Sequence, residues 1–165
     1  YSGTSRLVTL DRGRGRPARL EVKVPAGIAD GGRVRVRPEG GPELHLVVSV
    51  QPDPRFRRDG ADLHVDVPVL LADLMLGGEA EAPTMTSRIA LKIPAGTQNG
   101  RHFRIAGKGM PKLGTPSQFG DLYATVKAVL PEALSDEEMR LFERLRELQQ
   151  GARARTGRAG KGDSP

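Results

Sequence analysis

Two segments of the chain have nearly the same sequence: KVPAGIADGGRVRV occupies residues 23–36 and KIPAGTQNGRHFRI occupies residues 92–105. The similarity extends upstream at the same offset, because the apolar positions of residues 20–24 match those of residues 89–93. Apolar and polar residues alternate on both sides of each Pro-Ala-Gly turn, which is the pattern of half-buried strands. Downstream, ELHLVVSV resembles DLYATVKAV once a longer loop is allowed in the second copy. The repeat predicts a duplicated β module with three strands in each copy.

The paired glycine-rich turns suggest two anion-binding loops as an alternative. A phosphate loop leads into a helix whose amino end holds the anion. Here each turn is followed by the alternating residues of a strand. Turn glycines and strand interiors account for the shared positions, so we interpret the repeat as architecture.

Further short elements extend each copy. The segment LLADLML has apolar residues at helical spacing and is followed by Gly77 and Gly78, which predicts a short helix. Additional strands are expected at residues 6–10, 44–50, 61–69 and 79–85. Loops are expected at residues 11–19 and 106–120, and the Pro-rich segment QPDPRFRRDG is interpreted as a junction.

The chain changes character after Pro131. Ser135 and Glu138 stand at the spacing of a capping box, and acidic residues fill the first turn. One apolar stripe follows at helical spacing, made by Met139, Leu141, Phe142, Leu145 and Leu148. Gly151 is expected to end this helix. The sequence thus predicts all-β architecture with two tandem small β-sandwich domains, each with little helix (residues 1–58 and 59–131), then a C-terminal α-helix (132–150) and a disordered tail (151–165).

Composition limits the chemistry. Apolar residues make up 37% of the chain and aromatic residues 4%, so each core must be small and built from aliphatic side chains. The absence of Cys excludes disulfides, thiolate metal sites and cysteine nucleophiles, and fits a cytoplasmic protein. No segment approaches the roughly 20 apolar residues of a membrane span. The chain starts without Met and is interpreted as a fragment or a processed form.

No pattern of catalytic or metal-binding residues is apparent. His45, His64 and His102 are scattered, and no Ser lies in a nucleophile elbow. We therefore expect no enzyme activity, no cofactor and no metal. Residues 1–58 contain 12 Lys and Arg against 6 acidic residues, which could attract nucleic acid. Aromatic residues for base stacking are nearly absent there, so a solvated charged face is favoured and nucleic-acid binding stays an alternative.

Taken in order, these segments resemble the carboxy-terminal half of DnaJ-type co-chaperones (J-domain proteins) over roughly residues 3–150. The motifs that carry the resemblance are VPAGIADGGRVRV, PRFRRDGADLHVDVPV, LLADLMLGG, APTM, KIPAGTQNGRHFRIAGKGMP and GDLYATVKAVLP. The family's J domain, its Gly/Phe-rich linker and the first strand of its first domain have no counterpart here. No CxxCxGxG repeat is present, as in the zinc-free, CbpA-like subclass. Thr86 and Ser87 replace the family's usual Asp-Gly turn.

The resemblance implies binding of unfolded polypeptide in a shallow apolar groove of the first domain, partly by strand addition. Matching positions are Val8, Leu10, Leu20 and Phe56, with ordinary core as the competing interpretation. It also implies a DnaK-type partner chaperone, whose acidic tail could be received by Arg19, Lys23 or Arg35. The helix at 132–150 resembles the family's dimerisation element and predicts a homodimer, although packing on its own domain, or a purely structural dimerisation arm without a groove, stays open.

Overall fold

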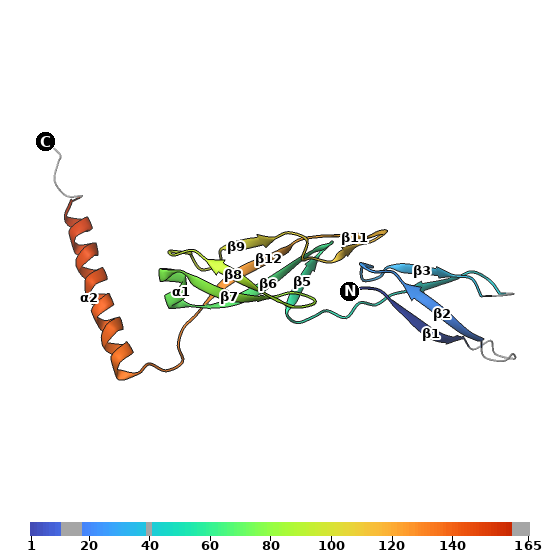
Figure 1. The fold of residues 1–165 in the computed structure, drawn as a ribbon, viewed down its shortest axis with the longest axis horizontal. Helices are drawn as coiled ribbons and strands as arrows, with labels where there is room; N and C mark the ends of the chain where they lie inside the picture. The colour runs from blue at the N-terminus through green and yellow to red at the C-terminus, as the bar shows by residue number, and fades with distance from the viewer. Residues whose placement is uncertain (11–17, 39–40, 160–165) are drawn as a thin grey trace. The chain divides into compact units, whose positions relative to one another are not determined.

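A computed structural model of the chain describes residues 1–10, 18–38 and 41–159 (Figure 1). It consists of two compact units, Tyr1–Val129 and Leu130–Pro165. The first unit is built of strands with one short helix, and the second contains a single long helix. This confirms the predicted all-β architecture with a C-terminal helix. The predicted loop at 11–19 lies largely outside the described residues.

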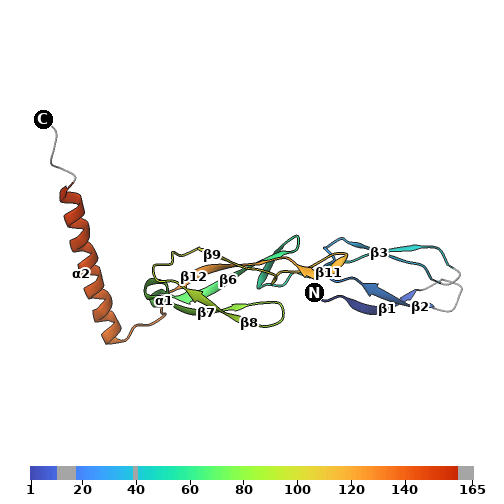
Figure 2. The same ribbon diagram turned by 45° about the horizontal axis from the view of Figure 1, so that its top comes forward.

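The first module, as we call residues 1–50, contains two antiparallel ribbons (Figure 2). One pairs β1 (Thr4–Leu10) with β2 (Ala18–Val24), and the other pairs β3 (Arg33–Val36) with β4 (Leu44–Val47). Apolar and polar residues alternate along β2 and β3, so each of these strands has one apolar face. Val22 is the one hydrophobic residue that is buried in the described part of this module.

The second module, residues 56–129, contains a four-stranded sheet in the order β5–β6–β12–β9. Its strands are β5 (Phe56–Asp59), β6 (Asp62–Leu70), β12 (Leu122–Val129) and β9 (His102–Ile105). The central pair, β6 and β12, runs parallel over eight residues of each strand. The helix α1 (Leu71–Leu76) and the hairpin of β7 (Gly78–Pro83) and β8 (Arg88–Ile93) complete the module.

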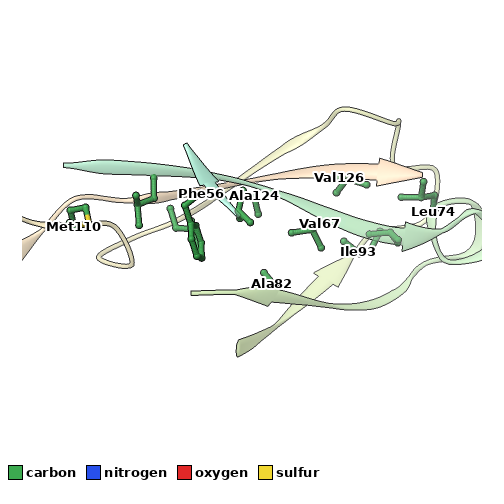
Figure 3. Close-up of a cluster of buried hydrophobic side chains, with 12 residues drawn as sticks. Phe56, Val67, Leu74, Ala82, Ile93, Met110, Ala124 and Val126 are labelled. Carbon is green, nitrogen blue, oxygen red and sulfur yellow. The ribbon is translucent and has the colours of Figure 1, made fainter. Parts of the chain in front are cut away.

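The core of the second module forms between this sheet and the β7–β8 hairpin (Figure 3). Inward-facing residues alternate along β6 and β12, and Val67, Leu122, Ala124 and Val126 are fully buried. The turn between β7 and β8 is fixed by Thr84, whose hydroxyl accepts a hydrogen bond from the Ser87 N–H (2.9 Å) and is itself buried. The two copies of the repeat show similar burial: Ile93 of β8 and Val22 of β2 are buried, and the other inward-facing apolar residues of β2, β3, β8 and β9 are half-buried.

The structure corrects the prediction for QPDPRFRRDG. Residues 56–59 form β5, which pairs with β6 through the partners Phe56 and Val65. Consequently the sheet of the second module begins before the predicted boundary at residue 58, and Phe56 belongs to that sheet. The division into two separate domains stays a prediction, since residues 1–129 form one compact unit.

Two further expectations were wrong. The predicted loop at 106–120 contains a small hairpin of β10 (Pro111–Lys112) and β11 (Thr115–Phe119). The helix α2 (Asp136–Ala159) continues past Gly151, so the first nine residues of the expected disordered tail are helical. A Gly inside a helix costs only about 1 kcal/mol relative to Ala, so Gly151 alone does not end a helix whose following residues include Ala and Arg. No helix among the described residues is long and apolar enough to cross a membrane.

Candidate functional site

The β1–β2 ribbon of the first module presents an apolar face. Val8 lies directly opposite Leu20, and Leu10 lies opposite Ala18. Because cross-strand partners share one face of an antiparallel pair, Val8, Leu10 and Leu20 lie on the same side as Val22. Val8 and Leu20 are half-buried, whereas Val22 is buried. The side chain of Leu10 is outside the described part of the structure. The register therefore brings together three of the four residues predicted from sequence.

The β3–β4 ribbon adds a second set of apolar side chains. Val34 pairs with Leu46, and Val36 pairs with Leu44, so these four share one face. All four are half-buried. In the second module the equivalent strands contribute to a cluster of twelve buried residues. The first module thus retains accessible apolar surface that its own described residues do not seal.

The outer edge of β1 is the second element of this candidate site. Among the described strands, β1 pairs with β2 alone. An edge strand presents a row of backbone N–H and C=O groups that can pair with an added strand. The edge adjoins the face that carries Val8. An extended apolar segment could therefore gain backbone hydrogen bonds and side-chain burial together.

The three basic candidates do not lie on this apolar face. Arg19 and Lys23 pair with Thr9 and Ser5, and so project from the side of β2 opposite to Leu20. Arg35 pairs with His45 on the outer side of the β3–β4 ribbon. All three basic residues are exposed. An acidic segment bound by them would contact the outer surface of the module.

Phe56, predicted as a groove residue with ordinary core as the competing interpretation, lies in the second module and not on the apolar face of the first. Its side chain is 8% exposed and belongs to the core of the second module. The Arg55 guanidinium lies 5.1 Å from the ring centroid and covers it. Arg55 also donates two hydrogen bonds to Asp53, and this side-chain interaction lowers the pKa of Asp53 to about 2. The ring of Phe56 therefore packs into this core, and Arg55, Phe56 and Arg57 also line an open depression of the second module.

The outer face of the second sheet forms an open depression of about 680 Å³. His64 stacks on Tyr123 with ring centroids 5.1 Å apart, and His102 Nδ1 lies 2.9 Å from Thr125 Oγ1. Within the described residues there is no cluster of three or more potential metal ligands.

A polar junction borders this face at Asp121. Its carboxylate accepts hydrogen bonds from the Gly107 N–H (3.0 Å) and from Arg104 Nε (2.6 Å). These two contacts, the backbone one first, hold the pKa of Asp121 below its ordinary value. The junction ties the loop after β9 to the start of β12, and its role is structural.

The α2 helix carries the predicted apolar stripe. Its capping box forms as expected, because Ser135 Oγ donates to Glu138 Oε2 (2.7 Å) and accepts from the Glu138 N–H (3.3 Å). All members of the stripe are exposed in the single chain: Met139, Leu141, Phe142, Leu145 and Leu148. Exposed apolar residues in such a pattern mark a surface available to another chain.

Sequence reasoning missed the contribution of the β3–β4 ribbon. The signal was present as alternation in RVRV and LHL, which puts Val34, Val36, Leu44 and Leu46 on one face. Leu7, which is 74% exposed, projects from the side of β1 opposite to Val8 and is not part of this face.

Two tandem β modules followed by a capped helix match the architecture that the resemblance implies for the DnaJ C-terminal region. The family model described as the DnaJ C terminal domain matches residues 1–131. The chain belongs to this family.

Curated relatives agree with this assignment. Chaperone protein DnaJ 2 of Cutibacterium acnes is 41% identical over 137 residues, covering 78% of this chain and 36% of that protein. Chaperone protein DnaJ of Rhodopseudomonas palustris is 42% identical over 142 residues, covering 81% and 37%. Chaperone protein DnaJ of Neisseria meningitidis is 38% identical over 158 residues, covering 89% and 42%. The chain spans about two fifths of the length of these relatives.

Proposed function

We propose that this chain is the polypeptide-binding region of a DnaJ-type co-chaperone, and that it acts in the cytoplasm without covalent chemistry. It binds unfolded segments on the apolar face of the first module, where Val8, Leu10 and Leu20 lie beside the open edge of β1. The supporting observation is the contrast between the modules, because the described part of the first has one residue in the buried hydrophobic core, Val22, whereas the second has a cluster of twelve buried residues. Phe56 is not on this face, because it belongs to the core of the second module and lines a depression there.

A matched pair of variants tests this face. Val8→Ser with Leu20→Ser makes the apolar face polar, whereas Leu7→Ser makes the same change on the opposite side of β1. We expect the double variant to lose binding of a fluorescent, permanently unfolded polypeptide, measured by anisotropy, and the Leu7 variant to retain it. Equal affinity in all three proteins would refute the groove.

The same assay separates the alternative function. Binding to DNA falls steeply as salt rises, because counterions are released from the phosphates. Apolar binding survives moderate salt. If the chain binds single-stranded DNA tightly and loses both ligands in moderate salt, the basic face is the functional one and nucleic-acid binding replaces the proposal.

We also propose that the bound polypeptide is delivered to a DnaK-type chaperone and that the protein is a homodimer through α2. The exposed apolar stripe supports the dimer, and two linked grooves raise the avidity for one unfolded chain. Light scattering tests it: Phe142→Ser with Leu145→Ser should halve the mass, whereas Glu143→Ser should not change it. If the wild-type protein has the mass of a monomer, α2 is not a dimerisation helix and this proposal is wrong.

For the partner, Arg19, Lys23 and Arg35 are the proposed contacts of an acidic tail, and all three are exposed. Exposed ion pairs contribute little individually, so the three would act together. An acidic peptide should bind the wild-type protein in low salt and lose affinity when all three are changed to Gln. If the affinity for the acidic peptide is unchanged in this variant, these three residues are not the binding site for the partner's tail.

A further inference from the structure

The Pro-Ala-Gly turn occurs once in each module with the same backbone conformation. Gly27 and Gly96 both have a φ of 75°, a left-handed value that strains any other residue. The two turns are surrounded by different residues. The same turn can therefore be compared in two environments within one protein.

In the second module the turn is held by its own helix. The Gly96 N–H donates to the Met75 carbonyl (3.2 Å), and the Thr97 N–H donates to the Leu74 carbonyl (3.0 Å). These carbonyls lie in the last turn of α1, where the helix leaves them without an internal partner. A β-carbon added at Gly96 would meet no atom within 4 Å. This turn is fixed within its module and faces open space.

In the first module the turn is held by the second module instead. Arg58 of β5 donates from Nη2 to the Gly27 carbonyl (2.6 Å) and from Nη1 to the Ile28 carbonyl (2.8 Å). Its Nε donates to the Gly60 carbonyl (2.8 Å), which orients the guanidinium. A planar guanidinium can make all three bonds at once, and an ammonium group cannot match that geometry.

The β10–β11 hairpin of the second module also contacts the turn at Gly27. A β-carbon added at Gly27 would collide with the carbonyl of Pro111, at the start of the β10–β11 hairpin. This hairpin lies on the side of the second module that adjoins the first (Figures 1 and 2). Phe119, which pairs with Pro111 in this hairpin, lies near Tyr1, with ring centroids 6.3 Å apart.

From this geometry we infer that Arg58 is a positioning residue, which joins the first module to the second so that both move as one rigid arm. Modules joined by a short linker move relative to each other unless a specific interface prevents it. Here the interface is the Arg58 fork on the backbone of the first turn, with the Pro111 carbonyl packed against Gly27. The inference is independent of what the apolar face of the first module binds.

The chain has no Cys, so spin labels attached to two introduced cysteines will react at no other position. Val47→Cys on β4 and Lys92→Cys on β8 are exposed positions, one in each module. Electron–electron double resonance then measures the distribution of distances between them. We expect one narrow distribution in the otherwise unchanged protein, and a broad one in Arg58→Ala and Arg58→Lys.

Gly27→Ala and Gly96→Ala form the matched comparison. Both introduce the same backbone strain, but only the first collides with the neighbouring module. Gly27→Ala should broaden the distribution, and Gly96→Ala should leave it narrow. Circular dichroism tests whether each variant is folded. If Arg58→Ala does not fold, Arg58→Lys alone provides the measurement for Arg58.

Three results would overturn the inference. The first is a broad distribution in the unchanged protein. The second is a narrow one in Arg58→Lys, and the third is equal broadening in the two glycine variants. Loss of polypeptide binding in Val8→Ser with Leu20→Ser does not bear on any of them, because those residues are not part of the joint.

Discussion

Replacing Phe56 with Ala distinguishes a core role from a binding role for this side chain. The ring is 8% exposed and packs in the cluster that includes Val65 and Val67. Truncating a buried Phe to Ala costs about 3–5 kcal/mol, because burial is lost and a cavity is left. The loss of the Arg55 contact adds about 0.5–1 kcal/mol.

The resulting loss of unfolding free energy should be about 3–6 kcal/mol. For a module of this size, each kcal/mol corresponds to a fall in Tm of about 4–8 °C, so the melting temperature should fall by more than about 10 °C. Urea unfolding followed by circular dichroism measures the free energy. Leu7→Ala is the control, since Leu7 is 74% exposed and a surface change of this kind shifts stability by only about 0.5 kcal/mol.

The reasoning fails if Phe56→Ala unfolds like the control. It also fails if the variant keeps its stability but loses affinity for unfolded polypeptide, since that would return Phe56 to the groove. A stable core with unchanged binding would show that neighbouring side chains refill the cavity, and would refute the magnitude worked out above.

Three other predictions use local contacts. Thr84→Val removes the acceptor of the Ser87 N–H in a buried turn and should cost about 1–3 kcal/mol in urea unfolding, whereas Thr86→Val should cost little. Ser135→Ala removes the cap of α2, which should cost about 0.5–2 kcal/mol of helix stability and reduce helical circular dichroism. The pKa of Asp121 is lowered in the folded state, so its stabilising effect is complete above the unfolded pKa of about 4 and is lost as the pH falls through the folded value. Asp121→Asn should therefore flatten the loss of stability in acid, and an unchanged acid slope would contradict the assignment.

Sequence alternation identified most strands because each has one apolar face. RLEVKV and RVRV show this at β2 and β3, and LLADLML followed by two glycines marked α1 correctly. These elements form where local pattern and tertiary burial agree.

The strand β5 was missed because its four residues, FRRD, contain one apolar side chain. Its burial comes from pairing with β6 across a turn that includes Asp59 and Gly60. An Asp-Gly pair between two strands is a strong hairpin signal, and Gly60 does adopt a positive φ of 58°. The β10–β11 hairpin has a weaker signal, because its turn contains Leu113-Gly114 and only Gly114 adopts a positive φ, of 83°. The role of Arg58 had no local signal, because its acceptors are 30 and 31 residues away in sequence.

The parallel pairing of β6 and β12 also has a consequence for biosynthesis. These strands are the longest in the second module and stand near its two ends in sequence, at residues 62–70 and 122–129. Contacts between distant residues form late, because the loop-closure entropy must be overcome first. The central sheet therefore cannot close on the ribosome until Val129 has left the exit tunnel, and until then the apolar face of β6 stays open. The second module itself spends this interval as an unfolded polypeptide.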